Sequence, residues 1–165
     1  MQILIFSDSH GDVETMCTVV RKENPDVIIH LGDHITDADT LSEKYPDIKM
    51  YKVLGNTDSQ KEDEQWIQYA QICGKSFMLT HGHTFLEQAT TYIEGQAKMF
   101  RTYAGSVDFI VHGHTHEPFL HCCDGKWIMN PGRIGKSHRQ NNTPIYGVLE
   151  VKATGALAWR FVQVE

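Results

Sequence analysis

The chain has 165 residues, of which 41% are hydrophobic and 22% are charged. These proportions are typical of a globular domain and exclude a disordered or fibrous protein. The formal net charge of −6 argues against binding of nucleic acid through a broad basic surface, because that mode needs clustered Lys and Arg. We therefore expect a single domain over residues 1–165 with its own core, and no stable binding of nucleic acid.

The apolar run at residues 3–6 is too short for a signal peptide or a membrane helix, and no charged segment precedes it. This pattern favours a cytoplasmic protein that does not interact with membranes. The four cysteines, Cys17, Cys73, Cys122 and Cys123, show no CxxC spacing. We therefore expect reduced, mostly buried thiols rather than ligands of a structural zinc.

In the first half of the chain, short β-branched runs alternate with helical segments. The pattern predicts strands at residues 2–6, 27–31 and 48–54, and helices at residues 12–22 and 39–44. Strands that alternate with helices imply right-handed crossovers and a largely parallel sheet that is buried on both faces.

The second half reads mostly as strands. They are predicted at residues 65–72, 75–80, 107–111, 119–123, 126–129, 146–151 and 156–164, with a helix within residues 89–103. Cys73-Gly74 and Asp124-Gly125 are pairs suited to hairpin turns. The antiparallel C-terminal half suggests a second sheet packed on the first. The predicted fold class is therefore α/β, with two packed mixed β-sheets flanked by helices.

Five predicted strands end in residues that can bind metal ions. In open α/β sheets these ends converge on the functional site. The five segments are Asp8-Ser9-His10, Gly32-Asp33-His34, Gly55-Asn56-Thr57-Asp58, His81-Gly82-His83 and the stretch VHGHTH at residues 111–116. One such motif alone is weak, because Asp and Gly are common in turns. The recurrence at five strand ends is what indicates a shared site.

The ligand types favour a pair of transition-metal ions. Carboxylate, amide and imidazole groups suit manganese, iron, cobalt, nickel or zinc, and the candidates outnumber what one ion can use. Two ions about 3.5 to 4 Å apart that share a carboxylate would clamp the attacking and leaving oxygens of a displacement at phosphorus. Two carboxylates and two divalent ions leave a local charge of roughly +2, which attracts a phosphate ester to an acidic chain.

The stretch VHGHTH admits three interpretations. Its histidines could be metal ligands, acids and bases, or one polar face of a regular strand, because alternate residues of a strand share a face. Gly113 argues against the regular strand, since a glycine often marks the place where a strand gives way to a loop. The three histidines need not act alike.

Taken together, DSH, GD, GN, HGH and GHTH in this order resemble the calcineurin-like metallophosphoesterase superfamily. The short length and Asn130-Pro131-Gly132 resemble its small prokaryotic phosphodiesterase branch. The resemblance implies that one metal is bound by Asp8, His10 and His116, and the other by Asn56, His81 and His114, with Asp33 bridging both. His10, Asp33 and Asn56 are the residues expected to matter most for catalysis.

The resemblance also implies the reaction. A hydroxide held between two divalent ions, with manganese the first expectation, would attack the phosphorus of a small or nucleotide-like phosphodiester. Many family members carry GNH[DE], whose histidine can protonate the leaving group, but this sequence has Thr57 at that position. Threonine has no useful pKa near neutrality, so we expect esters whose leaving groups need little protonation, such as aryl phosphodiesters.

The roles of several residues near the motifs stay open. His112 and His83 are expected to orient or pack against ligands, and His34 either packs beside Asp33 or supplies a proton. The polar loop with Arg133, Lys136, His138 and Arg139 either holds a phosphate oxygen or is a solvated basic segment.

Rival functions also stay open. They are a phosphomonoesterase or nuclease with the same centre, and a non-catalytic protein-interaction scaffold on this fold. A single structural metal would leave several ligands unused. Trp66 and Tyr69 could line the interface of a homo-oligomer, although aromatic residues at such spacing are more often part of a core.

Overall fold

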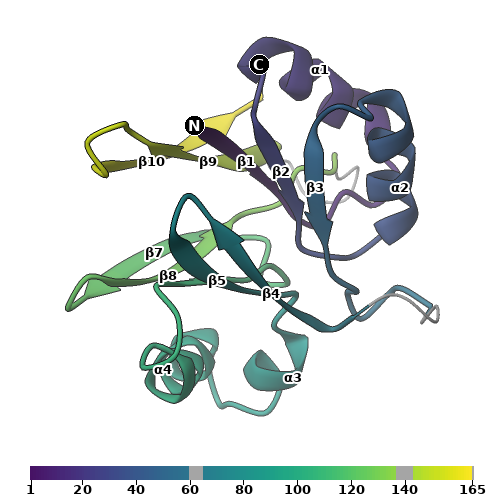
Figure 1. Ribbon diagram of the computed structural model, residues 1–165. Coiled ribbons are helices and arrows are strands. Elements are labelled where there is room, and N and C mark those ends of the chain that lie inside the picture. Colours follow the sequence, from purple (N-terminus) through teal and green to yellow (C-terminus); the bar gives the residue numbers. More distant parts are fainter. Residues whose placement is uncertain (60–64, 137–142, 165) are drawn as a thin grey trace.

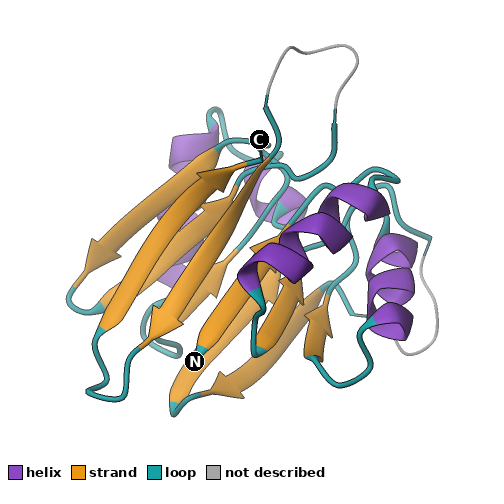
Figure 2. Ribbon diagram, turned by 90° about the horizontal axis from the view of Figure 1, so that it is seen from above, coloured by secondary structure: helices purple, strands orange, loops and turns teal. Residues whose placement is uncertain are grey.

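The structure is a computed structural model that describes residues 1–59, 65–136 and 143–164. Two five-stranded sheets pack face to face, and helices cover the outer face of each sheet, as Figure 1 and Figure 2 show. The predicted fold class, two packed mixed sheets flanked by helices, is confirmed.

The first sheet contains the parallel strands predicted from the N-terminal half. Its strand order is β10-β9-β1-β2-β3, with β1 parallel to β2, β2 parallel to β3, and β9 antiparallel to both β1 and β10. Its elements are β1 (Gln2–Phe6), α1 (Val13–Glu23), β2 (Val27–His30), α2 (Ile35–Lys44), β3 (Lys49–Lys52), β9 (Ile145–Val151) and β10 (Leu157–Gln163).

The second sheet has the order β4-β5-β6-β8-β7, in which β5, β6 and β8 run parallel and the two outer pairs are antiparallel. Its elements are β4 (Ile67–Ile72), β5 (Lys75–Thr80), α3 (His83–Leu86), α4 (Tyr92–Tyr103), β6 (Phe109–Val111), β7 (Pro118–Cys123) and β8 (Lys126–Pro131). The short helix α3 was not predicted, because four residues are too few for a helical period to be visible.

Successive side chains of β1 point alternately into two different cores. Ile3 and Ile5 point into the core between the two sheets, while Leu4 and Phe6 point into the core under the helices α1 and α2. A third core lies between the second sheet and the helices α3 and α4. Both faces of β1 are therefore buried, as expected for a central strand with apolar residues throughout.

Two predictions of fold detail were wrong. The hairpin β9–β10 belongs to the first sheet and not to the second, because β9 is apolar on both faces and pairs with β1, for example Ile3 with Leu149. Helix α2 begins at Ile35 and not at residue 39, since Ile35 and Ala38 are buried in the fold.

The prediction of mostly buried thiols was also wrong. Of the four free cysteines, Cys17 is buried, but Cys73, Cys122 and Cys123 are exposed. They lie in or beside the hairpins β4–β5 and β7–β8, where side chains on the outer face meet solvent. Tyr69 is exposed as well, which contradicts a core position for that residue.

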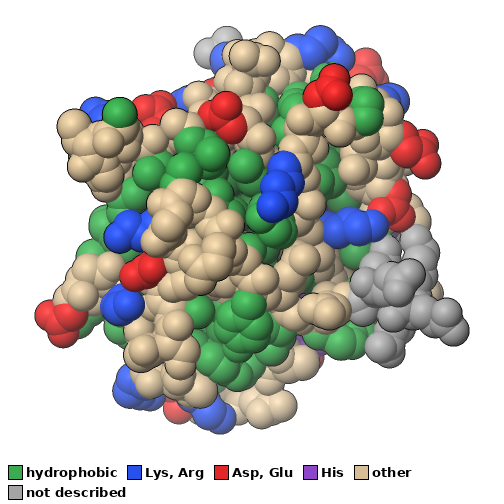
Figure 3. Space-filling view, in the orientation of Figure 1, with side chains coloured by type: hydrophobic (Ala, Val, Ile, Leu, Met, Phe, Trp, Pro, Cys, Tyr) green, Lys and Arg blue, Asp and Glu red, His purple; other side chains and the backbone are tan. Residues whose placement is uncertain are grey.

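The surface shows no concentration of positive charge on the face in Figure 3. There, Lys and Arg side chains are scattered among Asp and Glu and form no continuous basic stripe. Among the described residues, no helix combines the length and the apolar character needed to cross a membrane.

Candidate metal centre

The structure brings together the seven ligands expected from the sequence. They lie just beyond the carboxyl ends of β1, β2, β3, β5 and β6 and form two adjacent clusters. The seven are Asp8, His10, Asp33, Asn56, His81, His114 and His116. Because β1, β2 and β3 are parallel in one sheet and β5 and β6 in the other, their carboxyl ends open to one common edge of the molecule.

The first cluster is formed by Asp8, His10 and His116. Each of these residues offers one ligand atom, and the three atoms lie within 4.8 Å of one another. His116 Nε2 is 3.1 Å from Asp8 Oδ1. The rings of His10 and His116 meet edge to face, with centroids 5.6 Å apart. The three residues lie in the loops that follow β1 and β6, which belong to different sheets, so the cluster depends on the packing of the two sheets.

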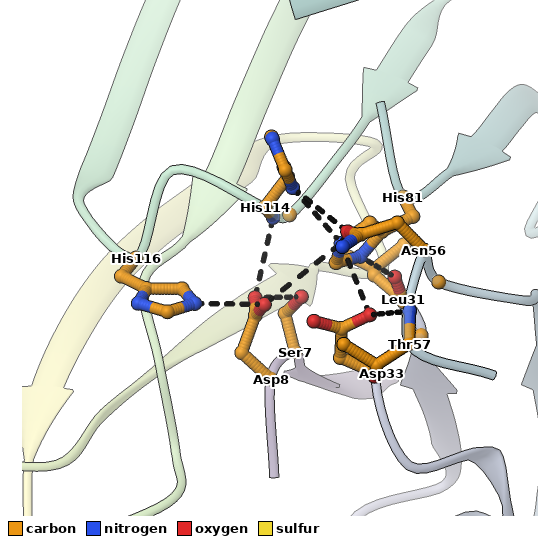
Figure 4. A network of polar contacts seen from close by, with 12 residues as sticks. Ser7, Asp8, Leu31, Asp33, Asn56, Thr57, His81, His114 and His116 are labelled. Carbon is orange, nitrogen blue, oxygen red and sulfur yellow. Dashed lines mark hydrogen bonds and ion pairs between the residues drawn. The ribbon is translucent and has the colours of Figure 1, made fainter. Parts of the chain in front are cut away.

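The second cluster is formed by Asn56, His81 and His114. Asn56 Oδ1 lies 2.9 Å from His81 Nε2 and 3.0 Å from His114 Nδ1. The two imidazole nitrogens are 3.3 Å apart. Figure 4 shows these three side chains pointing toward one another beside Asp33.

Asp33 lies between the clusters. Its Oδ1 atom is 3.4 Å from His81 Nε2, and its Oδ2 atom is 3.9 Å from His10 Nε2. One carboxylate oxygen therefore faces each cluster. This is the position that a shared carboxylate would need.

A buried carboxylate oxygen of Asp8 indicates that the first cluster suits a cation. Asp8 Oδ2 accepts hydrogen bonds from Ser7 Oγ at 2.5 Å and from the His114 backbone N–H at 3.2 Å. Asp8 Oδ1 is buried and accepts no well-formed hydrogen bond from the described residues, although His116 is close. A buried oxygen without a donor is costly unless a cation balances it. The free Oδ1 atom belongs to the first cluster.

The tautomer of His81 leads to the same conclusion for the second cluster. His81 Nδ1 lies 2.8 Å from the backbone carbonyl oxygen of Leu31, which can only accept, so Nδ1 carries the hydrogen. Nε2 then presents a lone pair to Asn56 Oδ1 and Asp33 Oδ1. Three acceptors that face one another repel, and a divalent ion relieves that repulsion. The residues present therefore fit metal ions at both clusters.

The charge states of the site favour metal binding near neutral pH. Burial alone would raise the pKa of Asp8, but His116, His81 and the Ser7 hydroxyl together hold it at about 2. Burial lowers the pKa of His10, and burial with the neighbouring His81 lowers the pKa of His114. A neutral imidazole has the lone pair that a metal requires, and an ionised Asp8 supplies charge.

The backbone of the site is strained. The described residues other than glycine with a left-handed φ include six at this edge: Asp8 (57°), His10 (47°), Asp33 (61°), His34 (70°), His114 (70°) and His116 (61°). Such conformations are uncommon for residues with a Cβ and cluster at functional sites. The sequence gives no signal of this strain, because Asp and His are ordinary residues at strand ends.

Gly113 has a different role from the predicted one. Strand β6 already ends at Val111, two residues before it. A Cβ at Gly113 would lie 1.9 Å from Ser7 Oγ, so glycine lets the loop of His114 lie against the loop of Asp8 while Ser7 keeps its hydrogen bond to Asp8. Gly113 therefore lies where the two loops of the first cluster, which follow β1 and β6, approach each other closely.

His112 lies outside both clusters. It is fully buried, and its Nδ1 atom is 3.0 Å from the Gly113 carbonyl oxygen and 3.4 Å from Asn130 Nδ2. Asn130 Nδ2 donates to the same carbonyl at 2.7 Å. Burial lowers the pKa of His112 to about 4, so the ring is neutral. It packs beneath the GHTH loop, in agreement with a supporting role.

Asp58 is a supporting residue whose role the sequence did not reveal. Its Oδ2 atom accepts hydrogen bonds from the backbone N–H of Gly55 at 2.8 Å and of Asp33 at 3.0 Å. Its Oδ1 atom accepts from the Ile35 N–H at 2.8 Å. The last residue of GNTD thus ties the loop after β3 to the loop after β2. The signal in the sequence is an acid two residues after Asn56, within the same motif.

A buried chain of hydrogen bonds supports the loop after β1 and was also missed. Ser9 Oγ donates to Asp37 Oδ2 at 2.7 Å and lies 3.0 Å from His30 Nε2. His30 Nδ1 accepts from the Gly32 N–H at 3.3 Å, so Nε2 carries the hydrogen toward Ser9. Burial lowers the pKa of His30 to about 4. Nothing in the sequence distinguishes His30 from an ordinary residue at the end of a strand.

The remaining candidates surround the centre. The ring of His34 meets His10 edge to face at 5.4 Å, and the ring of His83 meets Trp66 at 5.2 Å. The Arg133 charge helps to lower the pKa of His10, and its Nη2 donates to the Lys136 carbonyl. His138 and Arg139 lie outside the described residues.

The comparisons with known proteins decide the family. The sequence pattern of the calcineurin-like phosphoesterase superfamily domain matches residues 1–154. The chain belongs to this superfamily. A probable metallophosphoesterase of Mycoplasma pneumoniae is 31% identical over 149 residues, which are 88% of this chain and 86% of that protein. Membership implies divalent metal ions and the hydrolysis of phosphoric esters.

Solved structures share the fold. A predicted phosphoesterase of Streptococcus pneumoniae aligns with a TM-score of 0.74 at 21% identity, over 98% of this chain and 88% of that one. Vps29 of Entamoeba histolytica, complexed with Zn²⁺, has a TM-score of 0.69 at 19% identity and covers 99% of both chains. An archaeal phosphodiesterase has a TM-score of 0.68 at 20% identity, over 98% of this chain and all of that one.

Proposed function

We propose that this phosphoesterase is a two-metal phosphodiesterase. One divalent ion is held by Asp8, His10 and His116, and the other by Asn56, His81 and His114. Asp33 is shared between them. The observation that carries the proposal is the position of Asp33, with one carboxylate oxygen facing each cluster.

The bound ions supply Lewis acidity, which makes a water easier to deprotonate and balances charge on the phosphoryl oxygens. The chain's own residues fix that chemistry in space. Asn56 cannot ionise, so it adds no negative charge to the second cluster, and its side-chain oxygen faces both His81 and His114. Two carboxylates against two divalent ions leave roughly +2, which favours a bound phosphate ester.

The presence of Thr57 at the position where many relatives carry a histidine supports diesters with good leaving groups. Thr57 approaches the centre through its backbone, whose N–H donates to Asp33 Oδ1 at 3.1 Å. Its hydroxyl is too weak an acid to serve as a general acid for the leaving group near neutral pH. We therefore expect aryl or otherwise activated diesters to be hydrolysed faster than alkyl esters. The resemblance in fold to an archaeal phosphodiesterase supports the same choice.

The experiment combines metal analysis with two model substrates. Protein purified without chelator is analysed for metals and assayed with added manganese on bis-p-nitrophenyl phosphate and p-nitrophenyl phosphate. We expect about two ions per chain and faster hydrolysis of the diester. Asp33→Asn, which keeps the shape of the side chain, should abolish activity, whereas Asp47→Asn at an exposed loop should not. Lack of turnover with every metal, or an active Asp33→Asn variant, would contradict the proposal.

The likeness to Vps29 favours a second candidate, an interaction scaffold on the same fold. The same experiment separates it from the enzyme. A scaffold would show no turnover with any metal and would keep its fold in the Asp33→Asn variant. The seven side chains with ligand atoms that meet at one edge argue for the enzyme, because a scaffold has no need of such a set.

A further inference from the structure

A carboxylate from outside the sequence motifs contacts the second cluster. Glu87 follows the short helix α3, and its Oε1 atom lies 3.3 Å from His114 Nε2. None of the sequence motifs contains Glu87, and its side chain is 57% exposed. A carboxylate that is free to extend into solvent instead lies against the ring of a candidate ligand.

The two nitrogens of His114 face different partners. Nδ1 faces Asn56 Oδ1 at 3.0 Å and His81 Nε2 at 3.3 Å, whereas Nε2 faces Glu87. Figure 4 shows the ring with one nitrogen toward Asn56 and the other pointing away from the network. Asn56 Oδ1 beside Nδ1 and the Glu87 carboxylate beside Nε2 can both only accept, so each favours the hydrogen on its own side of the ring. An ion at the second cluster needs the lone pair of Nδ1, and the hydrogen then belongs on Nε2, where Glu87 can accept it. Nδ1 is then left with its lone pair directed at the second cluster.

We propose that Glu87 is the positioning residue of the second metal site: it fixes the tautomer and the orientation of His114, so that Nδ1 is ready to bind the ion. The inference rests on the proposed two-metal centre and extends it to a residue outside the motifs. The carboxylate raises the basicity of the ring and reduces its freedom to rotate, which are the usual effects of such partners on ligating histidines.

The surroundings of His114 make Glu87 necessary. The rings of His81, His83 and Tyr92 lie around that of His114 at centroid distances of 5.1 to 6.2 Å, but ring packing does not decide which nitrogen carries the hydrogen. His81 is held by the Leu31 carbonyl oxygen, but the Nε2 atom of His114 has only Glu87 in that role among the described residues. Without the carboxylate, the ring could adopt either tautomer and could turn away from Asn56.

The test measures metal binding directly, apart from activity. The metal-free wild type and the variants Glu87→Ala and Glu87→Gln are titrated with Co²⁺ by calorimetry, and the visible absorption of the bound ion is followed. We expect Glu87→Ala to weaken one of the two sites by about 10- to 100-fold and to leave the other unchanged. Glu87→Gln should restore most of the affinity, because its amide oxygen can also accept a hydrogen bond from Nε2.

Glu94→Gln is the matched control. It changes a glutamate in the first turn of α4 whose carboxylate accepts from the Thr90 N–H at 3.2 Å and contacts neither cluster. Both sites should keep wild-type affinity in this variant. A Glu87→Ala protein with two unaltered sites, or with both sites weakened equally, would overturn the inference. A wild type that binds no Co²⁺ would instead refute the proposed centre itself.

The ring tautomer gives a second readout. In ¹H–¹⁵N spectra of the metal-free proteins, the tautomer of His114 with the hydrogen on Nε2 should be more populated in the wild type than in Glu87→Ala, where only the acceptors beside Nδ1 remain. A purely structural role for Glu87 would leave the tautomer unchanged. The same tautomer in both proteins would therefore also contradict the inference.

Discussion

The two ends of the parallel strands use the same devices for different purposes. At the carboxyl ends, residues with positive φ carry ligands, and Asp58 ties together the loops after β2 and β3. At the amino ends of the second sheet, positive φ occurs in the turns Cys73-Gly74 and Asp124-Gly125. There Asp108 accepts hydrogen bonds from the backbone N–H and the hydroxyl of Ser76. Strain or a bridging aspartate alone therefore does not indicate a functional site.

The glycines at the two ends of the strands show the difference between these ends most clearly. A Cβ at Gly113 would collide with Ser7, and a Cβ at Gly55 would lie 2.2 Å from the Asp33 backbone nitrogen. A Cβ at Gly125, whose φ is +73°, would meet nothing within 4 Å. Glycine is needed for space at the carboxyl ends and for backbone conformation at the hairpin turns. Substitutions at the two ends should accordingly have different consequences.

The largest effect is expected for Gly113→Ala. The added methyl would overlap Ser7 Oγ and crowd Ser7 Cβ and Asp8 Oδ2, so either Ser7 turns away from Asp8 or the two loops separate, and both changes disturb the first cluster. We expect kcat/KM for a diester to fall by about 100-fold or more, since a misplacement of about 1 Å can have such an effect. Metal analysis of the same protein should show less than two ions per chain. Wild-type activity would show that the loop can yield without cost.

Variants of Asp58 and Asp108, which both bridge backbone segments, should differ in their effect: the first should change activity and stability, and the second stability alone. Asp58→Ala removes the acceptor of three backbone N–H groups beside Asp33, so we expect activity to fall about 10-fold and stability to fall as well. Asp108→Ala removes a similar bridge at the opposite end and should lower the urea midpoint without a change in kcat/KM. If both variants lost activity equally, the distinction between the two ends would not hold.

The buried histidines beneath the site predict a dependence of stability on pH. Burial lowers the pKa of His30 and His112 from 6.5 to about 4 in the folded state, so the unfolded chain binds more protons between those values. Stability of the metal-free protein should therefore fall as the pH is lowered from about 6.5 toward 4.

Urea unfolding at pH 7 and pH 5 measures this dependence. His112→Gln should reduce the difference in unfolding free energy between the two pH values, because the variant has one fewer buried group that must stay neutral. A variant with the same pH dependence as the wild type would exclude His112 as a source of the effect.

The smallest effect is expected for Gly125→Ala. The methyl meets no other atom, but alanine is strained at this φ, which costs about 1 kcal/mol. We expect a slightly lower melting temperature and unchanged hydrolysis and metal content. A loss of activity in this variant would mean that the hairpin turn influences the distant carboxyl ends.

Much of the fold and the ligand set could be predicted from the sequence. Hydrophobic alternation located the strands, and the chemistry of Asp, Asn and His at five strand ends indicated a metal centre. The residues that hold the ligands in place could not be predicted. The hydrogen bonds of Asp58 and the contact of Glu87 with His114 depend on how the two sheets pack, and local sequence does not encode that packing. The exposed thiols escaped prediction because burial depends on which face of a hairpin meets solvent.

Electron paramagnetic resonance of the protein loaded with two equivalents of Mn²⁺ tests the central claim most directly. If Asp33 is shared, the two ions should be magnetically coupled and give a multiline spectrum, and Asp33→Asn should lose this coupling. Two independent six-line signals in the wild type, or coupling that persists in Asp33→Asn, would contradict a centre in which the two clusters share Asp33.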